Sequence, residues 1–155
     1  LIGMPGCGKT TIARELGQAL NRMVIDADTQ LIADYGMPIT DIFSTQGERA
    51  FRTMETAVLS QLGKQSGMII STGGGCVTQA ENYPHLHQNG TIFWICRSID
   101  QLPTDGRPIS QANSLTKLYT IRKPLYEAFA DHRINNDGSI ADAVSQIIKI
   151  LEDQI

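Results

Sequence analysis

Glycine, lysine and threonine stand at the start of the chain in a spacing that binds phosphate. Residues 3–10 read Gly-Met-Pro-Gly-Cys-Gly-Lys-Thr and fit G-x-x-x-x-G-K-[ST], the phosphate-binding P-loop. The backbone N–H groups of such a loop turn towards phosphate oxygens, Lys9 reaches the β- and γ-phosphates, and Thr10 helps to hold Mg²⁺. The pattern predicts binding of ATP and Mg²⁺. The expected nucleotide contacts are Gly6, Cys7, Gly8, Lys9, Thr10 and Thr11.

Two aspartates follow the next apolar run. Met23-Val24-Ile25 predicts a short buried strand, and Asp26 and Asp28 come at its carboxyl end. Ligands of open α/β sheets bind at this edge. Asp26 is the better placed of the two for Mg²⁺, through water. Asp28 is a candidate to orient or deprotonate an acceptor hydroxyl.

A run of three glycines follows another predicted strand, residues 68–71. Gly73, Gly74 and Gly75 favour close approach of the backbone to a ligand, either the acceptor or the γ-phosphate, over a merely flexible turn. The polar stretch of residues 97–113 then has the length and composition of a loop and is expected to act as a lid. Arg107, held beside Pro108, is its natural cation.

Arg52 and Arg122 lie on predicted helices and could face the same acceptor. Two guanidiniums in one pocket imply an anionic acceptor, most simply a carboxylate bound through two hydrogen bonds. Taken by itself, the helix around Arg52 favours another reading. Glu48, Arg52 and Glu55 are spaced four and three residues apart, as in a solvent-exposed ladder of ion pairs.

Strand and helix patterns alternate along the whole chain. Helices are predicted after the P-loop, over about 48–65 following an interruption at Gly47, over 81–88, over 115–129 with a break or kink at Pro124, and from Ser139 onwards. Further strands are predicted at 91–96 and 132–135. This order predicts one α/β domain over residues 1–155, with a parallel sheet covered by helices on both faces.

Composition narrows the classes of function. The chain has 155 residues, 41% of them hydrophobic, and a net charge of −3, which argues against a nucleic-acid partner. No apolar run is long enough to span a membrane. The three cysteines have no metal-ligand spacing, and the sequence shows no signal-peptide pattern. Together these observations suggest reduced thiols in the cytoplasm. A monomer is expected, because no exposed apolar stripe is evident.

The motifs, taken in order, resemble those of the shikimate kinase family, within the nucleoside-monophosphate-kinase-like P-loop enzymes. They cover nearly the whole chain. They are the P-loop, Asp26-Ala27-Asp28, Ile39 to Glu55, Gly73-Gly74-Gly75, Arg107-Pro108 and Arg122-Lys123-Pro124-Leu125-Tyr126.

The resemblance implies a three-layer α/β/α fold with a five-stranded parallel sheet, an acceptor-binding segment at about 29–61 and a lid at about 97–113. It implies transfer of phosphate from ATP to the 3-hydroxyl of shikimate, in aromatic amino-acid biosynthesis. Asp28 would bind shikimate hydroxyls and act as the base. Glu55 would orient Arg52, against the exposed-ladder reading. Arg52 and Arg122 would bind the shikimate carboxylate, and the shikimate pocket would be lined by Gly74, Gly75, Phe43 and Phe51. Lys9 and Arg107 would contact the phosphates. Thr10 and Asp26 would hold Mg²⁺.

Two features depart from the family pattern. The family's lid often has a further arginine before Arg-Pro, and residues 101–106 contain none. Only Leu1 and Ile2 precede Gly3, so the given sequence lacks the residues that should form most of the first strand. Two alternatives remain: a kinase for another small metabolite, such as gluconate or a nucleotide, and a nucleotide-binding module without catalysis. The intact set of Lys9, Thr10, Asp28, Arg52 and Arg107 disfavours the module.

Overall fold

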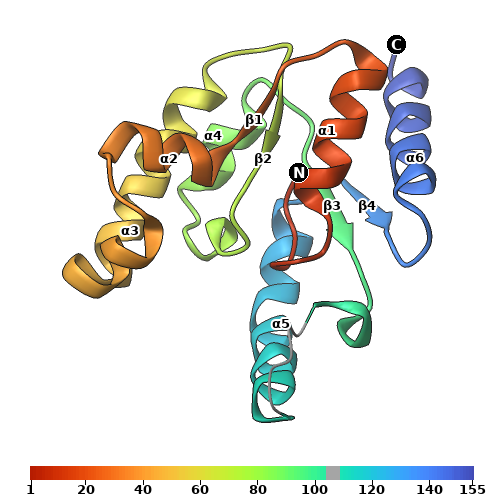
Figure 1. Ribbon diagram of the computed structural model, residues 1–155. Coiled ribbons are helices and arrows are strands. Elements are labelled where there is room, and N and C mark those ends of the chain that lie inside the picture. The colour runs from red at the N-terminus through yellow and green to blue at the C-terminus, as the bar shows by residue number, and fades with distance from the viewer. Residues whose placement is uncertain (104–108) are drawn as a thin grey trace.

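The computed structural model describes residues 1–103 and 109–155, with backbone only for residues 109–113. Strands and helices alternate, as the sequence pattern predicts (Figure 1). The strands are β1 (Val24–Asp26), β2 (Ile69–Ser71), β3 (Phe93–Cys96) and β4 (His132–Asn135). The helices are α1 (Lys9–Leu20), α2 (Ala27–Tyr35), α3 (Ile39–Gly63), α4 (Asn82–His87), α5 (Ile109–Phe129) and α6 (Ile140–Asp153), with short 3₁₀ turns at Cys76–Thr78 and Ile99–Gln101.

The strands form two parallel pairs, β1 with β2 and β3 with β4. The first two residues of the chain lie between the pairs. Ile2 N–H donates to Phe93 O at 2.9 Å, and Ile95 N–H donates to Ile2 O at 2.8 Å. On the other side, Thr72 N–H donates to Leu1 O at 3.1 Å. The parallel α/β arrangement is confirmed, but in the described residues it consists of two strand pairs and a bridge at Ile2, short of one regular five-stranded sheet.

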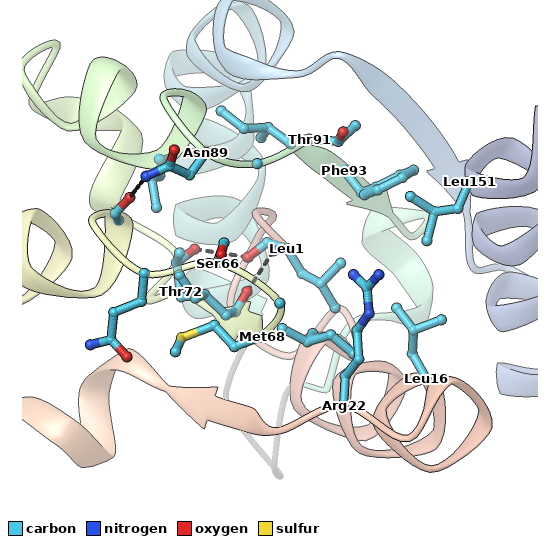
Figure 2. Close-up of a pocket in the computed structure, with 18 of the residues that line it drawn as sticks. Leu1, Leu16, Arg22, Ser66, Met68, Thr72, Asn89, Thr91, Phe93 and Leu151 are labelled. Carbon is cyan, nitrogen blue, oxygen red and sulfur yellow. Dashed lines mark hydrogen bonds between the residues drawn. The ribbon is translucent and has the colours of Figure 1, made fainter. Parts of the chain in front are cut away.

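A cavity of about 230 Å³ lies beside Leu1, at the amino ends of β2 and β3 (Figure 2). Leu1 hydrogen-bonds along its β2 side, where its amino group donates to Ile70 O at 2.6 Å and its carbonyl accepts from the Thr72 hydroxyl at 3.0 Å. The other walls are mostly apolar, from Leu16 of α1 to Leu151 of α6. Apart from Thr72, none of its lining residues reaches the P-loop cavity described below.

Helices lie on both sides of the strands. α1 packs with α6 on one side, and α3 packs with α2 and α4 on the other (Figure 1). α6 begins with a capping box, in which the Ser139 hydroxyl accepts from Asp142 N–H at 3.1 Å and the Asp142 carboxylate accepts from Ser139 N–H at 3.3 Å. α3 is interrupted at Gly47, where φ is +84°, as the sequence predicts. No helix in the described part of the chain is long and apolar enough to cross a bilayer.

One expectation for residues 97–129 is wrong. Helix α5 already begins at Ile109, so the loop predicted over 97–113 ends before that residue. Of the break or kink predicted at Pro124, the break does not occur, and α5 continues to Phe129 although proline cannot donate the hydrogen bond to residue 120. Tyr126 and Phe129 are buried in the core, and this packing holds the turns after Pro124 in place.

Candidate active site

The P-loop joins the chain start, between β2 and β3, to the first turn of α1. Gly8 is the residue before that helix and has φ +103°, a conformation that glycine adopts readily. A Cβ at Gly8 would lie 2.6 Å from Asn136 Nδ2, which donates to Cys7 O at 2.8 Å. The Cys7 side chain is buried, so this residue can offer a ligand only its backbone.

Lys9 is buried in the first turn of α1. Its ammonium group donates to Gly3 O at 2.8 Å and to Met4 O at 2.9 Å. Its third contact is the Cys7 sulfur at 3.7 Å, a weak acceptor that a phosphate oxygen can replace. The buried charge and the backbone N–H groups at the start of α1 make this a site for anions.

A cavity of about 580 Å³ opens in front of the loop. Nine predicted site residues line it: Gly6, Gly8, Lys9, Thr10, Thr11, Asp26, Asp28, Gly73 and Gly74. Pro5, Thr72, Arg97 and Ile140 complete its described wall. Six other predicted residues do not contribute to this described wall: Cys7, Phe43, Phe51, Arg52, Gly75 and Arg122. Arg107 lies outside the described residues.

Thr10 and Asp26 bring two oxygens together at the wall of this cavity. The Thr10 hydroxyl donates to Asp26 Oδ2 at 3.4 Å. The other Asp26 oxygen accepts from Thr29 N–H at 2.9 Å, which caps α2 and holds the carboxylate. The described residues contain no cluster of three or more metal-binding side chains. Such a sparse oxygen pair suits Mg²⁺, which keeps several waters and binds substrate phosphates.

Asp28 lies in the first turn of α2 and faces the same cavity. Burial raises the pKa of this carboxyl, the nearby Asp26 charge raises it further, and Lys9 and Arg52 oppose the shift. A Cβ at Gly73 would lie 2.9 Å from Asp28 Oδ1 and 3.0 Å from Glu55 Oε2. The glycine loop, residues 73–75, therefore lies directly against both acids. A carboxyl with a raised pKa beside a phosphate site has the chemical properties of a general base.

Arg52 and Glu55 form a buried ion pair on α3. Arg52 Nη1 lies 2.9 Å from Glu55 Oε1, and the Glu55 side chain is 3% exposed. Glu48 binds Arg52 at 3.4 Å from a side chain that is 64% exposed. Burial raises the pKa of Glu55, and Arg52 opposes this shift. Reading this stripe as an exposed ladder is wrong, because two of its three members are in the interior.

Arg52 also contacts the glycine loop and an aromatic pair. A Cβ at Gly75 would overlap the Arg52 guanidinium. The guanidinium carbon lies 5.1 Å from the centre of the Phe51 ring, whose centre is 4.8 Å from that of Phe43. Phe51 is buried, whereas Phe43 is 39% exposed, so the pair presents one ring to the outside.

Arg122 lies on α5, which comes after the glycine loop in the sequence. Its charge lowers the pKa of Glu55, as does that of Arg52. Arg122 also lowers the pKa of Tyr126, one helical turn further on. Asp28 and Glu55 therefore lie against Gly73, and Arg52 lies against Gly75. Arg122 is close enough to Glu55 for its charge to act on that carboxyl.

Known proteins are similar to this chain over nearly its whole length. The family model for shikimate kinase matches residues 5–152. The chain belongs to the shikimate kinase family. A shikimate kinase of Vibrio cholerae is 37% identical over 165 residues, covering 100% of this chain and 95% of the relative. One from Vibrio parahaemolyticus is 36% identical, covering 99% and 95%.

Solved structures agree with this assignment. The shikimate kinase of Acinetobacter baumannii in complex with shikimate has a TM-score of 0.91 at 32% identity, covering 99% of this chain and 91% of that one. The shikimate kinase of Aquifex aeolicus has a TM-score of 0.86 at 28% identity, covering 99% and 94%. Membership of this family identifies the chain as an enzyme, a phosphotransferase that uses ATP.

Sequence reasoning missed two polar residues of this shikimate kinase site. Arg97 follows β3 and lines the P-loop cavity. Its position directly after a strand was a usable signal, because the carboxyl ends of parallel strands carry ligand sites. The sequence assigns Tyr126 no role beyond its place in the motif of residues 122–126, yet its hydroxyl donates to Gly74 O at 2.6 Å. No local pattern predicts a contact between residues 52 positions apart.

Proposed function

We propose that this protein transfers the γ-phosphoryl group of ATP to the 3-hydroxyl of shikimate, forming shikimate 3-phosphate and ADP in aromatic amino-acid (chorismate) biosynthesis. The observation that carries the proposal is a shared cavity. Its wall contains the phosphate-binding residues Lys9 and Thr10 together with Asp28, the candidate base for an acceptor. A phosphoryl donor and a hydroxyl acceptor can therefore meet in one space.

On the donor side, the loop from Gly6 to Thr11 binds the ATP phosphates through its backbone N–H groups and Lys9. Thr10 and Asp26 are the residues that would hold Mg²⁺, which neutralises phosphate charge when bound. Arg107 is assigned to the lid as a cation for the transferring group.

On the acceptor side, Asp28 takes the proton of the 3-hydroxyl while that oxygen forms its bond to the γ-phosphorus and the bond to the ADP oxygen breaks. Arg52 and Arg122 bind the shikimate carboxylate, which suits the two planar donor groups of guanidinium. The glycine loop, Gly73 to Gly75, lines the pocket, and Phe43 and Phe51 form its apolar wall.

Arg97 is assigned as an additional cation for the nucleotide phosphates. It lines the P-loop cavity, and its buried Nε has no hydrogen-bond partner among the described residues. A buried guanidinium N–H without a partner favours an acceptor supplied by a ligand.

The same proposal covers the organisation of the protein. Leu1 and Ile2 belong to the central strand of a five-stranded parallel sheet, in a three-layer α/β/α domain over residues 1–155. The acceptor-binding segment is at about 29–61, and the lid lies between β3 and α5. We place the enzyme in the cytoplasm as a monomer without nucleic-acid or membrane partners. The three cysteines are unpaired and buried, as suits a reducing compartment.

A coupled ADP-release assay with a panel of acceptors tests the proposal. We expect turnover with shikimate and Mg²⁺-ATP, and little with gluconate or nucleoside monophosphates. Turnover with gluconate but none with shikimate would assign the chain to another metabolite. Nucleotide binding without turnover of any acceptor would indicate a non-catalytic module.

A further inference from the structure

Tyr126 is a buried residue of α5 with a polar group aimed at the active site. Its side chain is completely buried, and its ring stacks on Trp94 of β3 with centres 5.7 Å apart. Its hydroxyl nevertheless donates to Gly74 O at 2.6 Å. Burial raises the pKa of this phenol, so the hydroxyl stays protonated and remains a donor throughout the physiological range.

Gly74, the acceptor of this hydrogen bond, lies between the two halves of the site. A Cβ at Gly74 would be 2.7 Å from Pro5 Cδ, so the glycine loop packs directly on the P-loop. Both Gly74 and Pro5 line the cavity where donor and acceptor meet. A shift of the Gly74 carbonyl therefore changes the distance between the two loops.

Arg122 lies one helical turn before Tyr126 on α5. Because residues four apart share one face of a helix, both side chains leave α5 on the side of the glycine loop that Tyr126 contacts. Burial raises the pKa of Tyr126, and the Arg122 charge opposes this shift.

We propose that Tyr126 is a positioning residue for phosphoryl transfer, whose hydroxyl sets the glycine loop against the P-loop. This inference rests on the proposed function, because it concerns the same acceptor. Tyr126 does not contribute to the described wall of the P-loop cavity and acts through the Gly74 carbonyl.

The test is Tyr126→Phe, which removes one oxygen and keeps the ring that stacks on Trp94. Wild-type turnover of shikimate is measured first, and its absence would remove the proposed function and this inference together. Given an active wild type, we expect kcat/KM for shikimate to fall about tenfold, because the buried Gly74 carbonyl loses its hydrogen-bond donor. The change in KM for ATP should be much smaller. The matched control is Tyr83→Phe. The Tyr83 ring packs on Phe129 of α5, the helix that also carries Tyr126.

Two outcomes would overturn the inference while leaving the proposed function standing. One is a Tyr126→Phe enzyme with a lowered melting temperature but wild-type kcat and KM for both substrates, because that result indicates a purely structural hydroxyl. The other is a Tyr83→Phe enzyme that loses as much kcat/KM for shikimate as the Tyr126→Phe enzyme, because the effect would then not depend on the hydrogen bond from Tyr126 to Gly74.

Discussion

The Arg52 guanidinium and the Glu55 carboxylate meet 2.9 Å apart in the interior, three residues from one another on α3. An ion pair in this position is costly to bury and is strongly disturbed when one partner is removed. It is best explained as a support that fixes Arg52 beside the glycine loop, where Gly75 leaves no room for any side chain.

Glu55→Gln tests this support. We expect the free energy of unfolding to fall by about 1–3 kcal/mol, because the buried Arg52 charge loses its counter-ion, and KM for shikimate to rise. The control is Glu48→Gln, which alters the exposed partner of the same arginine and should change stability by less than about 0.5 kcal/mol. Chemical denaturation and steady-state kinetics measure both. Equal effects of the two variants would return Arg52 to the surface-ladder reading.

The raised pKa of Asp28 should set the acidic limb of the pH profile of kcat/KM. Its pKa is raised from 3.8 by burial and by Asp26, so the protonated, inactive form persists to higher pH than for a solvated aspartate. We expect kcat/KM to fall on acidification with an inflection above 3.8. Asp28→Asn should abolish most turnover at every pH. The control, Asp34→Asn, changes an exposed acid of the same helix that accepts from Gln30 at 2.8 Å. Wild-type rates in Asp28→Asn would exclude this residue as the base.

Arg122→Ala should mainly weaken the binding of shikimate. Loss of a charge-assisted contact costs about 1.5–3 kcal/mol, so we expect the dissociation constant for shikimate to rise about 10- to 100-fold with little change for ADP. Lys123→Ala is the matched control, since Lys123 is the next residue of α5 and forms an exposed ion pair with Glu127 at 2.9 Å. Isothermal titration measures both ligands. A loss confined to ADP would place Arg122 in the nucleotide site instead.

Arg97→Ala should weaken the nucleotide and leave shikimate unaffected. We expect the dissociation constants for ADP and ATP to rise about tenfold, since one cation is lost from the P-loop cavity. Adenosine, which lacks phosphates, should bind the variant and the wild type alike. Arg14→Ala removes the same charge from an exposed position on α1 and serves as the control. A matching loss of adenosine affinity would mean that Arg97 contacts the base and not the phosphates.

Local order was predictable from the sequence. The P-loop is a run of eight residues whose spacing alone specifies a phosphate cradle. Apolar runs located strands β1, β2 and β3, whereas β4 was predicted from a short and weak signal, since three of its four residues are polar. The Gly47 interruption and the Ser139 cap are likewise properties of neighbouring residues. Such features depend on interactions within a few positions, which is the range that a sequence pattern records.

Burial and long-range contact were decided only by the tertiary structure. Whether Glu55 or Glu48 is the buried partner of Arg52 depends on which face of α3 the rest of the molecule covers. The same packing continues α5 past Pro124 and brings Tyr126 to Gly74. Spacing along a helix is identical for an exposed and a buried ion pair. The sequence therefore determined which chemical groups this protein carries and on which elements, and the packing of those elements decided which groups meet and which are removed from water.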